Sequence, residues 1–109
     1  MNNETLMMKL RELLVLLMQS RSLSEKSADA MRYCREQMVE KTLPVNIYGE
    51  YREIIEHLSE LAEENNHIAP DDLLRSGGDL LLSILLLYER LAGEVAVNQY
   101  LNQNGVHYF

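Results

Sequence analysis

The sequence predicts an all-α protein, folded as a four- to five-helix antiparallel bundle with a central, highly apolar C-terminal helix. Three observations favour this fold class. Apolar residues recur at intervals of three and four along most of the chain, the period of a helix with one buried face. The two prolines, Pro44 and Pro70, fall where helices would end or begin. The 109 residues suffice for one domain, 1–109, with a single core.

The first helix is expected over about residues 4–19. After Glu12 this segment is apolar almost all round. Glu4 and Glu12 argue against a signal peptide, because such a peptide begins with a basic region. We therefore interpret the segment as a core helix. Its inward positions are Leu6, Leu10, Leu13, Leu14 and Leu17.

The second helix is expected over about residues 23–41. Ser22 followed three residues later by Glu25 is the pattern of a capping box, in which the two side chains satisfy free backbone N–H groups at the helix start. The apolar stripe is thin and most other positions are charged, which is typical of a peripheral helix. The stripe consists of Ala28, Met31, Cys34 or Arg35, and Met38.

The third helix, expected over about residues 46–65, has the most regular apolar face. Asn46 is a good N-cap residue, and the apolar positions then follow the 3.6-residue period closely. They are Ile47, Tyr51, Ile54, Ile55, Leu58, Leu61 and Ala62. The opposite side of this helix is acidic and is interrupted only by Arg52 and His57, so most of the net charge lies on one stripe.

The C-terminal third predicts a short helix over residues 71–76, a break at Gly77-Gly78, a long helix over 79–102 and a short tail, 103–109. Ser83 is the only polar residue between Leu80 and Tyr88, so the long helix needs neighbours on nearly every side. These neighbours belong either to a filled four-helix core or to a second subunit across a homodimer interface. The apolar run is too short to cross a bilayer, which needs about 20 residues.

The composition favours a protein partner over nucleic acid or membrane. Seventeen acidic and ten basic residues give a formal net charge of −7, which repels nucleic-acid backbones and anionic membranes and attracts basic proteins. The arginines are scattered among acidic residues and form no basic stripe. Cys34 is the only cysteine, so the chain contains no disulfide framework, and a cytoplasmic location fits best.

No constellation predicts catalysis, a metal or a cofactor. The three histidines are His57, His67 and His107, and they lie in three different segments outside any metalloprotease or di-iron motif. Glu53, His57 and Glu60 share one helix face and are the best local metal candidate, but a solvated acidic face is the simpler interpretation. Cys34 has the spacing of a small buried thiol among core methionines. We therefore expect a protein that is not an enzyme.

The acidic stripe is the candidate partner-binding site. Its residues are Glu50, Glu53, Glu56, Glu60 and Glu63, with Tyr48 as a nearby anchor. The leading hypothesis is an immunity or antitoxin-type inhibitor that neutralises a basic toxin, such as a nuclease, through this acidic helix face. The alternative is a secretion chaperone or small regulatory protein that binds a partner helix through exposed leucines.

Overall fold

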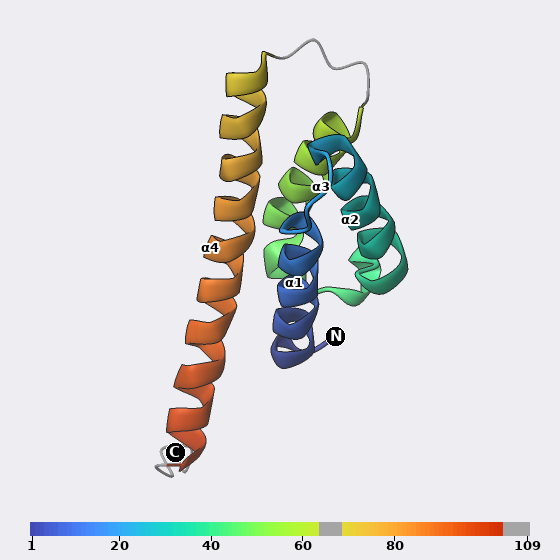
Figure 1. Cartoon of the computed structure of the whole chain (residues 1–109). Coiled ribbons are helices and arrows are strands. Elements are labelled where there is room, and N and C mark those ends of the chain that lie inside the picture. Colours follow the sequence, from blue (N-terminus) through green and yellow to red (C-terminus); the bar gives the residue numbers. More distant parts are fainter. Residues whose placement is uncertain (64–68, 104–109) are drawn as a thin grey trace.

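The computed structural model describes residues 1–63 and 69–103, and these form four α-helices that run alternately up and down (Figure 1). The helices are α1 (Asn3–Leu17), α2 (Leu23–Gln37), α3 (Tyr48–Ala62) and α4 (Pro70–Gln103). Two short 3-10 helices, η1 (Glu40–Thr42) and η2 (Val45–Ile47), connect α2 to α3. Both α1 and α3 pack against α2 on one side and α4 on the other. The predicted all-α antiparallel bundle is confirmed.

The core lies where the apolar faces of the helices meet. Leu6, Leu10 and Leu13 of α1 are fully buried, as their spacing predicted. The stripe of α2 is rotated from its predicted position, since Ser27, Ala30 and Cys34 are buried whereas the predicted Ala28 and Met31 are only half-buried. The small residues let the α2 backbone approach its neighbours closely. The core from α3 and α4 comprises Tyr51, Ile54, Leu58, Leu61, Leu80, Ile84, Leu87 and Leu91.

The ends of α1 and α2 follow from capping and from the need to bury Met38. Asn2 caps α1, and the Ser22 hydroxyl accepts a hydrogen bond from the Glu25 N–H at 3.2 Å, which confirms the first half of the predicted capping box. The second helix ends at Gln37 instead of residue 41. Met38 turns into the core there, and the Lys9 ammonium donates to the Gln37 carbonyl at 2.7 Å.

The start of α3 differs from the prediction because Ile47 has to reach the core. Asn46 is not the N-cap residue but lies within η2, and α3 begins two residues later, at Tyr48. Ile47 occupies the capping position and is fully buried, with no side-chain cap. The Asn46 carbonyl instead accepts a hydrogen bond from Arg90 of α4 at 3.2 Å. The helix ends at Ala62, before the predicted residue 65; residues 64–68 lie outside the described part of the chain.

The predicted break at Gly77-Gly78 is wrong, since α4 is one helix of 34 residues. Each glycine costs a helix interior about 1 kcal/mol relative to alanine, and packing of α4 against α1 and α3 outweighs that cost. At 1.5 Å per residue, α4 is roughly 51 Å long, about twice the length of the 15-residue helices beside it. It therefore projects beyond the end of the bundle (Figure 1). The predicted tail lies outside the described residues except for Gln103, which ends α4.

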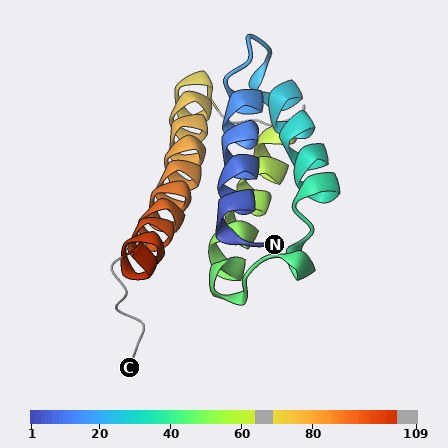
Figure 2. The ribbon, with the colours of Figure 1, turned by 90° about the horizontal axis from the view of Figure 1, so that it is seen from below.

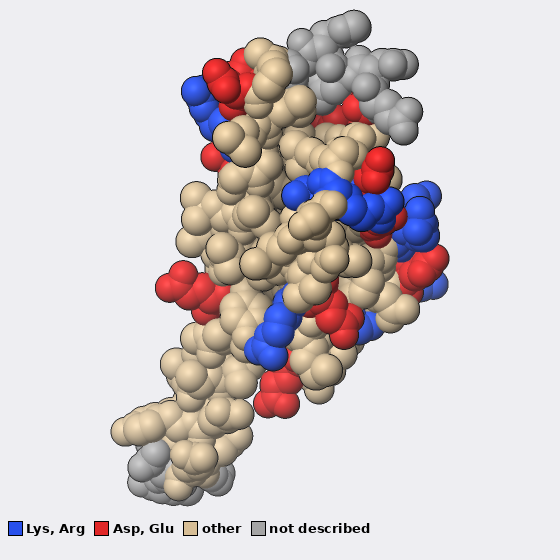
Figure 3. Space-filling model, viewed as in Figure 1, with Lys and Arg blue, Asp and Glu red and all other residues tan. Residues whose placement is uncertain are grey.

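One face of α4 has no neighbour among residues 1–63 and 69–103, in contrast to the predicted central position. The helix lies along one side of the bundle, against α1 and α3 (Figure 2). Leu82, Leu85 and Leu86 are about half exposed although they belong to the most apolar run of the sequence. Figure 3 shows largely uncharged surface along α4. Among the described residues, no helix has the combination of length and hydropathy needed to traverse a bilayer.

Candidate protein-binding surfaces

The outer side of α3 carries a row of carboxylates. Glu53, Glu56, Glu60 and Glu63 recur at intervals of three and four, so they lie on one side of the helix, and all four are exposed. We call these four residues the acidic face. Within the described residues, neither Glu53 nor Glu56 takes part in an ion pair. Their charge is therefore directed at solvent.

Glu50 does not belong to this face, although it is part of the predicted stripe. Its Oε1 atom lies 2.5 Å from Arg90 Nη1, so the side chain joins α3 to α4. Arg90 also contacts Glu94 at 3.6 Å, and Glu94 accepts a hydrogen bond from Asn3 at 3.1 Å. The helix period alone placed Glu50 with the other carboxylates, because it could not locate an arginine forty positions away in the chain.

Tyr48, the predicted anchor, is half-buried against the core at the start of α3. The Arg52 guanidinium lies over its ring, 5.6 Å from the centroid. Arg52 also bonds Glu40 through two nitrogens, at 2.8 and 2.5 Å. The one arginine on this side of α3 is thus held by Tyr48 and Glu40, and it forms no ion pair with Glu53 or Glu56.

A shallow hollow of about 360 Å³ lies between α2 and α3, next to the acidic face. Its apolar part consists of Met31, Tyr51 and Ile55. Carboxylates of Glu40, Glu56 and Glu60 lie around it, and the Arg52 guanidinium, which is paired with Glu40, also lines it. The Tyr51 hydroxyl donates to the Met38 carbonyl at 2.6 Å, so the ring is fixed in place. Sequence reasoning missed this hollow because it assigned Met31 to the core, where the rotation of α2 leaves it only partly covered. We call it the α2–α3 hollow.

His57 and Cys34 are the remaining candidates from the sequence that lie among the described residues. His57 is half-buried, and its Nε2 atom lies 2.6 Å from Ser76 Oγ, which joins α3 to α4. No group of histidine, cysteine and carboxylate side chains suited to a metal ion occurs within residues 1–63 and 69–103. Burial raises the pKa of the Cys34 thiol to about 11, so the thiol stays protonated near neutral pH. His67 and His107 lie outside the described residues.

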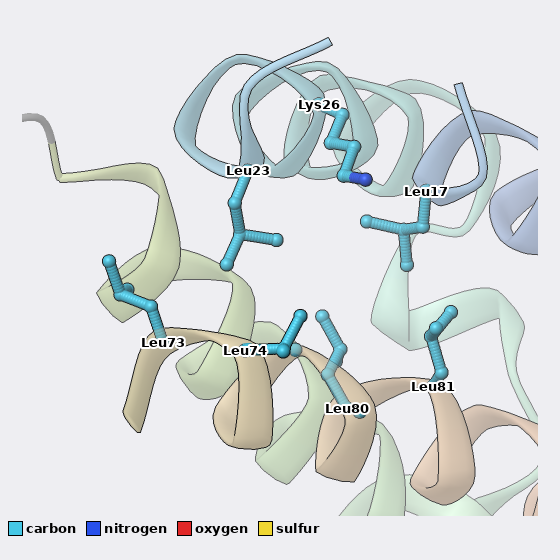
Figure 4. A pocket seen from close by; sticks show the side chains of 9 residues that line it. Leu17, Leu23, Lys26, Leu73, Leu74, Leu80 and Leu81 are labelled. Atoms are coloured by element: carbon cyan, nitrogen blue, oxygen red, sulfur yellow. The ribbon is translucent and has the colours of Figure 1, made fainter. Parts of the chain in front are cut away.

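A second cavity, of about 260 Å³, lies where the end of α1 and the start of α2 face the first turns of α4 (Figure 4). Leu17 and Leu23 point toward α4 across this cavity. Gly77 faces it from α4, and a methyl group added there would meet the Leu23 side chain at 3.6 Å. The cavity is therefore a leucine-lined gap that an additional methyl group fits.

The outer side of α4 is exposed, like the acidic face of α3, but it is apolar. Leu82, Leu85 and Leu86 form an apolar cluster, which we call the leucine face. Leu86 also borders a hollow that includes Glu53, so the acidic face and the leucine face adjoin between α3 and α4. Helical periodicity could not reveal this exposure, because the run is apolar on all sides and the pattern of a core helix equals that of an interface helix.

The acidic face, the α2–α3 hollow and the leucine face are the candidate binding surfaces of the described residues. Comparison with protein-family models, curated proteins and solved structures found no match to this chain.

Proposed function

We propose that this protein is a non-enzymatic binding module that recognises a basic protein through the acidic face. The observation that carries this proposal is the exposure of Glu53 and Glu56 without ion pairs, beside the apolar α2–α3 hollow. Within this class, an immunity or antitoxin-type inhibitor fits best: a small, rigid bundle that covers the cationic surface of a cytoplasmic toxin such as a nuclease. No catalytic group of its own is needed for that role.

The α2–α3 hollow supports this proposal because it matches the chemistry of a lysine or arginine side chain. Such a side chain buries its aliphatic part against apolar surface and keeps its charge at the edge. Met31 and Ile55 offer the apolar contact, and Glu56 lies at the edge. Carboxylates along the rest of the acidic face would accelerate association with a basic surface and fix its register.

Charge reversal on the acidic face tests the proposal. The basic protein is first isolated as a complex with the native chain from its source, and association is then measured with purified components. We expect Glu56→Lys to slow association by about tenfold or more, and rising salt to slow the wild type. Glu36→Lys, which makes the same charge change at an exposed position of α2, is the matched control. Equal association rates for Glu56→Lys and the control would refute this function.

A second candidate function is a secretion chaperone or small regulator that binds a partner's amphipathic helix. The exposure of Leu82, Leu85 and Leu86 favours it, since apolar helix faces of this kind form grooves and seams for other helices. Binding of that kind would be nearly indifferent to salt, whereas association through the acidic face would slow markedly. The salt dependence of the isolated complex therefore separates the two candidates.

A further inference from the structure

The leucine face is a cluster of exposed apolar side chains on the described part of the chain. Leu82 and Leu86 are 54% and 55% exposed, and Leu85, on the same side of α4, is 49% exposed. The neighbouring Ile84 and Leu87 are buried against α1 and α3. Large apolar side chains clustered in this way mark an interaction surface. The question is which molecule covers them.

The charges around the leucine face are arranged symmetrically. Arg75 lies seven residues before Leu82, and Glu89 lies seven residues after it. Seven residues are nearly two helical turns, so all three side chains lie on the same side of α4, with the charges about 10 Å from Leu82 in opposite directions. Both charged residues are exposed, and Arg75 has only a loose contact of 3.9 Å with Asp72.

We propose that a second copy of this chain covers the leucine face, with the two α4 helices antiparallel about a twofold axis near Leu82. This arrangement places Leu82 against its own copy and brings Arg75 of each chain to Glu89 of the other, which forms two ion pairs. A parallel arrangement would instead bring Glu89 against Glu89 and would gather the acidic starts of both helices, Asp71 and Asp72. The charge pattern therefore favours the antiparallel arrangement of two copies over the parallel one.

Gly78 fits the same arrangement. It lies four residues before Leu82, as Leu86 lies four residues after it, so Leu86 of each chain faces Gly78 of the other. In the single chain, a methyl group added at Gly78 meets nothing within 4 Å, so the fold of the monomer does not require glycine there. In the dimer, a glycine at this position leaves space for the leucine of the second copy. Asp79 lies three residues before Leu82, as Leu85 lies three after it, so in this register the exposed Asp79 side chain comes opposite Leu85 of the other chain, at the edge of the contact.

The interface expected from this pairing is small. Pairing about Leu82 overlaps residues 70–94 of both helices, roughly 37 Å of helix. With a contact strip about 10 Å wide, each chain buries on the order of 400 Å², about half of what each partner buries in a standard specific interface, which is the size of a weak, transient contact. We therefore expect a weak dimer that dissociates at roughly tens of micromolar or above. Glu53 borders the leucine face through the hollow that Leu86 lines, but the argument for the dimer uses no residue of the acidic face, so it does not rest on the function proposed above.

Sedimentation equilibrium of the full chain from about 1 to about 200 μM tests the dimer. We expect the wild type to associate and Leu82→Glu to remain a monomer. Val97→Glu is the matched control, because Val97 is exposed on the same helix but lies beyond the antiparallel overlap. A wild type that stays monomeric throughout would overturn the proposal and leave the face to a foreign helix. Equal disruption by Val97→Glu would overturn the antiparallel arrangement.

A charge exchange tests the register directly. Arg75→Glu and Glu89→Arg should each raise the dimer dissociation constant about fivefold or more, and the double variant should restore it to near the wild-type value. Gly78→Leu should weaken the dimer while raising the thermal midpoint of the dilute monomer, because it favours the helix and fills only solvent. A double variant no better than either single variant, or a Gly78→Leu chain that dimerises as well as the wild type, would contradict the pairing.

Discussion

The outer sides of α3 and α4 are exposed to a similar degree but differ in chemistry. On α3, carboxylates at Glu53 and Glu56 follow the helix period opposite a regular apolar face. On α4, leucines occupy the outer side as well as the inner one. The same bundle thus presents one surface suited to fast, salt-dependent encounter and another suited to apolar contact. The two sides are therefore suited to different partners, which is the basis of the two proposals above.

The largest expected effect is the difference in stability between substitutions on the inner and outer sides of α4. Ile84 is fully buried, whereas its neighbour Leu85 is on the leucine face. We expect Ile84→Ala to lower the free energy of unfolding by about 2–5 kcal/mol, because it leaves a cavity in the core. Leu85→Ala should change it by less than about 0.5 kcal/mol. Urea denaturation at about 1 μM, where the monomer predominates, measures both. Equal losses would show that the outer leucines are packed within a single chain.

A smaller effect is expected where α4 meets the leucine-lined cavity. Gly77→Ala should raise the free energy of unfolding by about 1 kcal/mol, since alanine favours the helix and its methyl group enters ordinary contact with Leu23 at 3.6 Å. Calorimetry should show a rise of the thermal midpoint by about 4 °C. Gly93→Ala, whose added methyl group meets nothing within 4 Å, is the control for helix propensity alone. If the thermal midpoint fell for Gly77→Ala but rose for Gly93→Ala, the cavity beside Gly77 would have no room for the added methyl group.

The smallest expected effect on stability is a difference between two carboxylates of α3, Glu50 and Glu53. Glu50→Gln removes the ion pair with Arg90 and should cost about 0.5 kcal/mol, less in high salt, because the pair is partly exposed. Glu53→Gln, on the acidic face, should leave stability unchanged within the error of a denaturation curve and should affect only partner association. A stability loss at Glu53 as large as that at Glu50 would place Glu53 in an internal contact.

Periodicity in the sequence was sufficient to predict the bundle and the acidic face, but not their boundaries. The inward leucines of α1 and the regular face of α3 follow directly from spacing. The start of α3 and the continuity of α4 through Gly77-Gly78 depend on tertiary packing, which overrides weak local preferences. For the same reason Glu50 could not be separated from the other carboxylates, since its partner Arg90 comes from a different helix.

The exposure of the leucine face was the least predictable feature. Sequence hydropathy shows that a helix needs apolar neighbours but not whether they belong to the same chain. The structure separates the two cases because, among the described elements, α4 packs against α1 and α3, and its C-terminal end projects beyond both (Figure 1). Its inner positions, such as Leu80 and Leu91, are buried, and its outer ones remain in solvent.

The central claim is that the two outer sides act separately, and one measurement tests it most directly. Sedimentation equilibrium is carried out in parallel on the wild type, Leu82→Glu and Glu56→Lys, each as the full chain. We predict a self-associating wild type, a monomeric Leu82→Glu and a Glu56→Lys that associates as the wild type does. A monomeric wild type, or a Glu56→Lys chain that dissociates like Leu82→Glu, would contradict the claim.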